Sequence, residues 1–295
     1  MKYRIIFAST DSLTLPILES LVLHDNCELV QILTKSGSVF EDWAIKHRAS
    51  VSTPTFLKEN LELFDQLRSL KPDFLIVVSY GFLIPSEMLE IPKLGAINLH
   101  PSLLPKYRGS SPAQWAIQRG EKISGMSVMT MSPEFDKGDL IFQWEISIED
   151  NETARSYYQK AFTQTAEKLP KILNDFADGK LKPIPQETKK GLFLARKLTK
   201  EDGKIDWNDP IEQIERQIRA FYPWPGAFTT FGALKEHLKI INPKLEISKG
   251  NDRMVKIIEA HLENGRLVIE KLQVEGKKPI SYAEFERGYL KIDTR

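Results

Sequence analysis

Short apolar segments alternate with stretches of helical periodicity along the first part of the chain. Residues 3–8 are mostly apolar, and apolar residues then recur over 13–22 at the spacing of one helix face. The same pattern predicts further strands at 29–33, 73–78 and 95–99, and helices at 43–47 and 57–70. Residues 74–78 are apolar without interruption, as in a strand that helices cover on both faces. The alternation predicts an α/β domain with a parallel, doubly wound sheet.

The pattern changes after the strand at 95–99. A helix is predicted at 113–119, and two strands at 126–131 and 140–148, joined by a turn at 135–139, form a predicted hairpin at the edge of the sheet. A long helix over 153–176 completes this part, so residues 1–180 are predicted to be one Rossmann-like sheet domain. No Gly-x-Gly-x-x-Gly sequence follows the first strand, which argues against NAD or FAD.

The remainder of the chain has a different pattern. Residues 181–204 are polar and irregular near two prolines, which predicts a linker. A helix is predicted at 211–221, and short apolar segments follow at 227–231, 238–241, 254–260 and 267–274, separated by glycines. Short strands at this spacing predict a small barrel or sandwich, and an OB-like β-barrel domain fits the size of residues 205–295.

The composition is that of a folded protein outside the membrane. The 295 residues are 41% hydrophobic and 27% charged, and no apolar run approaches the roughly 18 residues of a membrane span. The single cysteine, Cys27, cannot form an internal disulfide, and the first apolar run is too short for a signal peptide. We therefore expect a cytoplasmic protein with no membrane association.

Charge is distributed unevenly between the two parts. Residues 1–180 contain 19 Lys and Arg against 23 Asp and Glu, whereas residues 181–295 contain 22 against 17. The C-terminal part is therefore the basic one, and an anionic partner, if there is one, is expected to bind there.

Two polar residues, Asn98 and His100, stand at the end of a predicted parallel strand, where open α/β sheets bind ligands. Their side chains can share one face, and an amide with an imidazole provides donors for a developing oxyanion. Asp136, on the predicted turn, can pair with His100 or relay a proton. Plain structural roles stay open, because buried histidines are usually hydrogen-bonded and Asp-Lys-Gly-Asp commonly forms a turn.

Two other kinds of chemistry are disfavoured. Ser102 is separated from His100 by Pro101 and lies in no Gly-x-Ser-x-Gly turn, so a nucleophilic serine is not expected. The five histidines show no metal-binding spacing, so no metal site is expected.

The segment 98–109, with the sequence NLHPSLLPKYRG, resembles the signature of the folate-dependent formyltransferases. The segment 134–140, EFDKGDL, resembles the acidic loop of the same family, with Phe135 where the family has leucine. The resemblance continues over RIIFAST at 4–10, YGFLIP at 80–85 and KLTKEDGKIDW at 197–207. In the C-terminal part, FYPWPGAFT at 221–229 and LQVEGKKPISYAEFERGY at 272–289 resemble the members that act on methionyl-tRNA.

The resemblance implies a donor, an acceptor and roles for particular residues. The donor would be 10-formyltetrahydrofolate, the acceptor the amino group of methionyl-tRNA, and the partner the initiator tRNA. Asn98 and His100 would polarise the formyl oxygen, while Asp136 would orient His100 and manage the proton. The folate site would be formed by Ser102, Leu103, Leu104 and Pro105 on one wall and by Phe82, Leu83 and Ile84 at the pterin. We expect the enzyme to be a monomer.

One part of the family pattern is missing. Members of the common bacterial type carry a long basic insertion between the second strand and the next helix, and this insertion enters the acceptor arm of the tRNA. Here residues 34–39 lead almost directly into the predicted helix, with Lys35 as their one basic residue. We therefore expect a modest preference for the initiator tRNA. Further candidates for tRNA contacts are Lys106 and Arg108 beside the signature, and Lys244 and Lys277 in the C-terminal part.

Two other functions stay open on the sequence. An N-formyltransferase for an amino sugar nucleotide would use the same chemistry and would need no basic insertion, but the C-terminal resemblance argues against it. A folate-binding protein without transfer activity would need no catalytic groups, and the intact Asn98, His100 and Asp136 argue against that function.

Overall fold

The computed structural model describes residues 2–187, 192–241, 245–246 and 253–292. The chain divides into two compact units. The described parts of residues 1–112, 123–147 and 158–196 form the first unit, and those of residues 113–122, 148–157 and 197–295 form the second. Within the described residues, no helix is both long enough and apolar enough to cross a membrane.

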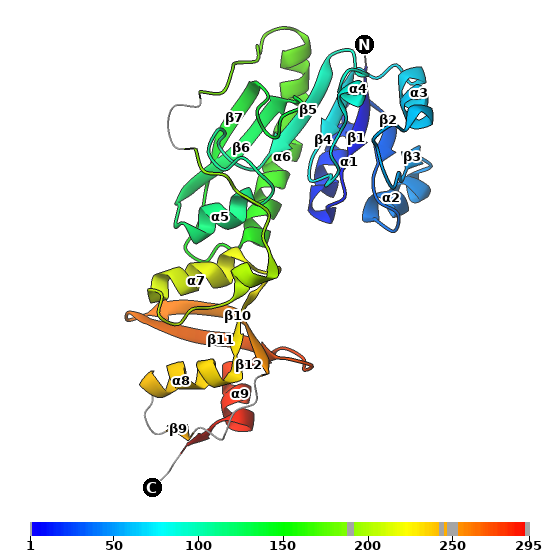
Figure 1. Ribbon diagram of the computed structural model, residues 1–295. Coiled ribbons are helices and arrows are strands. Elements are labelled where there is room, and N and C mark those ends of the chain that lie inside the picture. Colours follow the sequence, from blue (N-terminus) through cyan, green and yellow to red (C-terminus); the bar gives the residue numbers. More distant parts are fainter. Residues whose placement is uncertain (1, 188–191, 242–244, 247–252, 293–295) are drawn as a thin grey trace. The chain divides into compact units, whose positions relative to one another are not determined.

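The first unit is built around a seven-stranded sheet with the strand order β3-β2-β1-β4-β5-β6-β7 (Figure 1). The strands from β3 to β5 are parallel to one another, whereas β6 is antiparallel to β5 and β7 is antiparallel to β6. The sequence prediction of a mainly parallel sheet with a hairpin at its edge is confirmed. The strands are β1 Tyr3–Ala8, β2 Cys27–Leu33, β3 Val51–Ser52, β4 Phe74–Val77, β5 Gly95–His100, β6 Ile123–Thr130 and β7 Leu140–Ser147.

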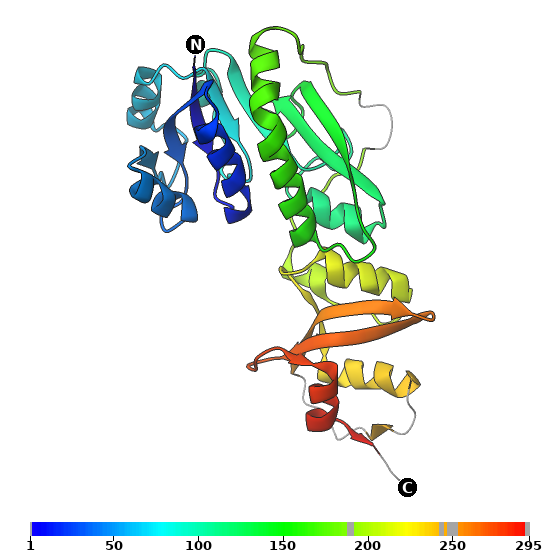
Figure 2. The same cartoon turned by 180° about the vertical axis from the view of Figure 1, so that it is seen from behind.

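Helices cover both faces of this sheet because side chains alternate along its strands. Phe7 of β1 contacts Phe40 of one helix, with 5.7 Å between the ring centroids. Ile6 and Ala8, one position away on either side, belong to a buried cluster with Phe64 of another helix. Figure 2 shows the long α6 lying along one face of the sheet. The helices are η1 Ser12–Thr14, α1 Leu15–Leu23, α2 Val39–His47, α3 Leu61–Ser69, α4 Ser86–Leu89 and α6 Ala154–Ala177, whose first residues belong to the second unit.

The strand direction of the sheet changes at β5. Its neighbour β4 runs parallel to it and ends at Val77, which pairs with Asn98, and its neighbour β6 runs the other way. The carboxyl ends of β4 and β5 therefore lie side by side next to the antiparallel hairpin. Ligands bind outside the carboxyl ends of the parallel strands in open α/β sheets, so a ligand is expected at this end of β4 and β5.

The second unit contains a four-stranded antiparallel sheet with the order β12-β11-β10-β8. Its core is a cluster of buried apolar side chains that includes Ile218, Leu234, Val255, Leu272 and Phe285. The elements are α5 Pro112–Gln118, which begins in the first unit, η2 Lys200–Gly203, α7 Ile211–Ala220, β8 Ala227–Thr230, α8 Phe231–Ile241, β9 Leu245–Glu246, β10 Met254–Glu263, β11 Arg266–Val274, β12 Ile280–Ser281, α9 Tyr282–Tyr289 and β13 Lys291–Ile292.

The strands predicted within 254–274 are confirmed, but a strand at 238–241 is wrong. That segment is the end of α8, whose buried residues Phe231, Leu234 and Leu238 recur at helical spacing. The apolar end of this helix was mistaken for a separate strand. Because β12 and β8 form opposite edges of the sheet and no pairing joins them in the described part of the chain, closure into a barrel stays a prediction.

Candidate active site

The strand β5 carries Asn98 and His100 two residues apart, and both side chains approach the same carboxylate. Asn98 Nδ2 lies 3.3 Å from Asp136 Oδ1, and His100 Nδ1 lies 3.6 Å from the same oxygen. Residues two apart on a strand point to one face, which is why they reach a single group. The structure thus brings together the three residues that the sequence predicts to be catalytic, while their roles stay a prediction.

Asp136 lies in the connection between β6 and β7 and is held in an unusual conformation. Its Oδ2 accepts the backbone N–H of Gly109 at 2.7 Å, and its side chain is only 10% exposed. Its φ angle of 52° is in the left-handed region, which residues other than glycine seldom adopt. Such a conformation persists only where neighbouring contacts maintain it.

His100 is 5% exposed, and its two ring nitrogens face different partners. Nε2 lies 2.9 Å from the carbonyl oxygen of Tyr107, and because a carbonyl only accepts, Nε2 carries the hydrogen of this bond. Nδ1 faces Asp136. In the neutral ring Nδ1 then accepts, and it donates to a substrate oxygen or to the carboxylate only when the ring carries a second proton.

A cavity of about 150 Å³ opens beside Asn98 and Asp136. Phe82, Leu83 and Ile84 line it, as do Tyr80 and other residues that follow β4. This volume is below the roughly 300–1,000 Å³ that enclose a drug-sized ligand, so the cavity can receive one end of such a molecule. That Phe82, Leu83 and Ile84 contact a pterin stays a prediction.

Tyr80 lines this cavity and has a buried hydroxyl. Tyr80 is 2% exposed, its hydroxyl has no hydrogen-bond partner among the residues described, and burial raises its pKa well above the ordinary value. A buried hydroxyl without a partner costs free energy. The hydroxyl oxygen is itself buried, so a ligand would reach it only if neighbouring side chains moved.

The loop at 102–105 does not line this cavity. Ser102 is fully buried and donates to the carbonyl of Lys106 at 2.8 Å, and Leu104 is also buried. The hydroxyl of Ser127 on β6 donates to the carbonyl of Ser102 at 2.5 Å and accepts the N–H of Leu104 at 3.2 Å. The loop therefore supports the chain between His100 and Tyr107, and the predicted contact of Ser102, Leu103, Leu104 and Pro105 with folate stays a prediction.

Lys35 lies on the short loop that replaces the basic insertion. Ser38 caps α2 by accepting the N–H of Glu41 at 3.2 Å, so the helix begins at Val39, immediately after the loop. Lys35 is exposed, and its Nζ lies 5.5 Å from the centre of the Phe82 ring, which lines the cavity. The structure thus places Lys35 beside one residue of the cavity lining, and a contact of Lys35 with tRNA stays a prediction.

The other predicted tRNA contacts lie in different surroundings. Lys277 is exposed in the turn after β11, and Lys106 is half-buried with its Nζ 5.3 Å from the centre of the Tyr107 ring. Arg108 is 7% exposed and has an internal partner, Gln186. Lys244 lies outside the described residues. Because a phosphate contact needs an accessible side chain, Lys277 fits this prediction better than Arg108.

No local pattern in the sequence predicts that Gln186 and Ala195, within the predicted linker, are close to the site, but both residues bond to the segment at 108–111. Ala195 donates its N–H to the carbonyl of Arg108 at 2.6 Å and accepts the N–H of Ser111 at 3.2 Å. Gly109 has a φ angle of 119°, and a Cβ there would lie 2.4 Å from the carbonyl of Ala195. Only a glycine tolerates this approach, so Gly109 is the local signal that another segment passes close by.

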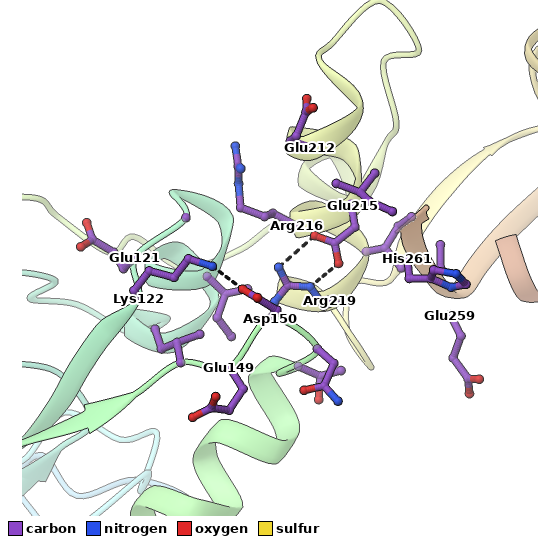
Figure 3. Close-up of a pocket in the computed structure, with 18 of the residues that line it drawn as sticks. Glu121, Lys122, Glu149, Asp150, Glu212, Glu215, Arg216, Arg219, Glu259 and His261 are labelled. Carbon is purple, nitrogen blue, oxygen red and sulfur yellow. Dashed lines mark hydrogen bonds and ion pairs between the residues drawn. The ribbon is translucent and has the colours of Figure 1, made fainter. Parts of the chain in front are cut away.

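A second cavity, of about 770 Å³, lies in the second unit and contains none of the predicted catalytic residues. Seven Asp and Glu and three Lys and Arg line it. Figure 3 shows that Arg219 is paired with Glu215 and Lys122 with Asp150. The basic groups that are paired in this way are neutralised and carboxylates remain in excess, so the lining repels phosphates.

No group of three or more His, Cys, Asp and Glu in the described part of the chain could hold a metal ion.

Two family models match the chain, formyl transferase over residues 35–173 and formyl transferase, C-terminal domain, over residues 197–290. A methionyl-tRNA formyltransferase of Clostridium acetobutylicum is 34% identical over 97% of this chain and 96% of its own length. Among solved structures, a methionyl-tRNA formyltransferase from Clostridium thermocellum has a TM-score of 0.61 at 19% identity and covers 92% of this chain and 98% of its own. A sugar N-formyltransferase from Shewanella has a TM-score of 0.62 at 16% identity and covers 77% of this chain and 92% of its own.

The matches and the geometry define a class of protein, a formyltransferase with a catalytic and a C-terminal domain. The chain belongs to the formyl transferase family and, within it, to the group that the methionyl-tRNA formyltransferases form.

Proposed function

We propose that this protein transfers the formyl group of 10-formyltetrahydrofolate to the amino group of methionyl-tRNA, which gives the N-formylmethionyl-tRNA used to begin translation. The observation that carries the proposal is that Asn98 Nδ2 and His100 Nδ1 lie 3.3 and 3.6 Å from the same oxygen of Asp136. These groups lie beside a cavity. A relative named methionyl-tRNA formyltransferase that aligns over 97% of the chain supports the choice of acceptor.

The geometry suits the chemistry of this transfer. The amine nitrogen attacks the formyl carbon, a new C–N bond forms, and the bond from the formyl carbon to N10 of the folate breaks. Negative charge develops on the formyl oxygen, and the donors that would stabilise it are the Asn98 amide and, in the doubly protonated ring, the Nδ1–H of His100. The amine loses a proton and N10 gains one. Asp136, next to both donors, is the group that would move it.

The cavity beside these groups fits one end of a folate. Phe82 and Leu83 supply apolar surface, and Leu83 is 66% exposed, so its side chain is open to a ligand. Asn98 and Asp136 supply polar groups beside the same cavity. A pterin has flat apolar faces and a polar edge, and both kinds of surface therefore find a complement here.

The test of this function compares acceptors. The protein is incubated with 10-formyltetrahydrofolate and, in separate reactions, with charged initiator tRNA or with amino sugar nucleotides, and formylated products are measured by mass spectrometry. We expect formylation of methionyl-tRNA alone. The short loop between Leu33 and Val39 is the one observation that favours a sugar nucleotide. A formylated sugar with unreacted tRNA would establish that alternative.

Binding of tRNA is expected to weaken steeply as salt increases, because contacts to phosphates release counterions. Lys277→Ala should weaken binding about equally for initiator and elongator methionyl-tRNA and reduce the slope of log Kd against log salt by roughly one unit. The measurement is Kd for both tRNAs across a salt series. Lys58→Ala, at an 86% exposed side chain of the first unit, is the matched control. Binding independent of salt would refute phosphate contacts as the basis of affinity.

We also propose an oligomeric state, a cellular compartment and a degree of tRNA preference for this enzyme. The enzyme would act as a monomer in the cytoplasm, where charged tRNA is present. Because the loop at 34–38 is short, the initiator tRNA would be preferred only modestly over elongator methionyl-tRNA. The two Kd values of the salt series measure this preference directly, and a large difference between them would refute the inference from the loop.

A further inference from the structure

The side chain of Gln186 bridges the two segments that form the candidate active site. Its Oε1 accepts from Arg108 Nε at 3.0 Å and from Arg108 Nη2 at 2.6 Å. Its Nε2 donates to the carbonyl oxygens of Asp136 at 2.9 Å and of Gly138 at 2.7 Å. Both lone pairs of the amide oxygen and both hydrogens of the amide nitrogen are therefore used.

These partners determine which way the amide points. A guanidinium group only donates and a carbonyl oxygen only accepts, so the reverse orientation would set like groups against each other at both ends. An amide is the side chain group that accepts at one end and donates at the other. Glutamate at this position would keep the acceptor for Arg108 and lose both donors to the loop.

Arg108 connects Gln186 to the groups that hold the catalytic side chains. The carbonyl of Tyr107, the residue before it, accepts from His100 Nε2 at 2.9 Å. The N–H of Gly109, the residue after it, donates to Asp136 Oδ2 at 2.7 Å. Arg108 is 7% exposed, and a charge at this burial needs acceptors. Gln186 thus ties the segment 107–109 to the loop that carries Asp136.

The backbone conformation of the loop around Asp136 depends on hydrogen bonds of this kind. Its left-handed φ angle of 52° is unfavourable for a non-glycine residue, and neighbouring contacts must maintain it. The two bonds from Gln186 end on the carbonyl of Asp136 itself and on that of Gly138, two residues further on. They hold the backbone from which the carboxylate reaches Asn98 and His100.

We propose that Gln186 is a positioning residue for formyl transfer, whose amide sets the place of the Asp136 carboxylate relative to Asn98 and His100. The expected effect of Gln186 on kcat rests on the proposed function, whereas the support that Gln186 gives to the loop around Asp136 does not. The test is Gln186→Glu, which keeps the shape of the side chain and the acceptor for Arg108. Gln66→Glu, at an exposed position of α3, is the matched control for the added charge.

The first measurement is steady-state kinetics of formyl transfer. Gln186→Glu should lower kcat by about 10-fold to 100-fold, the cost of a misplaced catalytic group, with little change in KM for 10-formyltetrahydrofolate. The second measurement repeats the change in an Asp136→Asn background. If Gln186 acts through the carboxylate, Gln186→Glu should change the kcat of the Asp136→Asn enzyme by less than about twofold. An equal fall in both backgrounds would show a general loss of structure and overturn the proposal.

The third measurement needs no substrate. Hydrogen exchange followed by mass spectrometry should show faster exchange over 134–140 in Gln186→Glu, with unchanged exchange in β1 and β4. Unchanged exchange of the loop would overturn the bracing. If the loop exchanges faster in Gln186→Glu but the wild-type protein formylates no tRNA, the proposed acceptor is refuted and the support of the loop by Gln186 still holds. Faster exchange with wild-type kcat would overturn the positioning role.

Discussion

Replacing Asn98 or His100 by alanine is expected to lower kcat for formyl transfer by roughly 10²-fold or more, the range for losing one oxyanion donor. The reason is that both groups flank Asp136 Oδ1, at 3.3 and 3.6 Å, and their donors would meet charge that develops mainly in the transition state. Folate binding should change little, because the substrate oxygen carries little charge before reaction. Steady-state kinetics and a folate-binding titration measure the two effects separately.

Asp136→Ala should be at least as damaging, because it removes the group that faces both donors. Asp136→Asn removes the negative charge but keeps the shape of the side chain, since the amide oxygen can still accept the N–H of Gly109. Asn26→Ala is a matched control, because Asn26 is exposed and lies outside the site. If Asn98→Ala, His100→Ala and Asp136→Ala all kept kcat near the wild-type value, the site would be wrongly assigned.

Gly138→Ala is expected to lower kcat by about 10²-fold although glycine has no functional group, because displacing a catalytic carboxylate by about 1 Å has this cost. A Cβ at Gly138 would lie 1.6 Å from the carbonyl oxygen of Thr130 on β6, so loop and strand must separate. Asp136, two residues earlier, must then move away from His100. Thermal unfolding should show a lower free energy of unfolding by roughly 1–3 kcal/mol, as for overpacking.

Gly232→Ala makes the same chemical change without a collision. A Cβ there meets no atom within 4 Å, and the residue lies in the helix α8. Alanine is favoured over glycine in helices, so this variant should keep its activity and be as stable as the wild type or slightly more. A Gly138→Ala protein with wild-type kcat would mean that the acidic loop can shift without moving the carboxylate.

The second unit shows where local patterns predict well and where they do not. The short apolar segment at 267–274, bounded by glycines, predicts a strand correctly, because a short apolar run between turn residues is a signal carried by neighbouring positions. The apolar residues at 238–241 were not recognised as helical, because their period is visible only together with Phe231 and Leu234. A short apolar run does not by itself distinguish a helix from a strand.

The linker at 181–204 shows a different limit of local patterns. Its prolines and lack of periodicity predict an irregular connection, and the described residues there, 181–187 and 192–204, contain little regular structure besides η2. Ile184 nevertheless exchanges two backbone hydrogen bonds with Leu140, and Gln186 and Ala195 bond to the segment at 108–111. An irregular segment can therefore support a site, because backbone N–H and C=O groups that are not paired within a helix or sheet form hydrogen bonds with other segments.

The amino-acid sequence is sufficient to predict the mainly parallel α/β sheet, the strand end that carries Asn98 and His100, and the candidate role of Asp136. These follow from periodicity, from side chain alternation and from motifs whose residues are close together in the chain. Only the tertiary structure decided that Gln186 joins Arg108, 78 residues before it, to the carbonyl of Asp136, 50 residues before it. The positions of such partners depend on how distant segments pack, which no local pattern along the chain encodes.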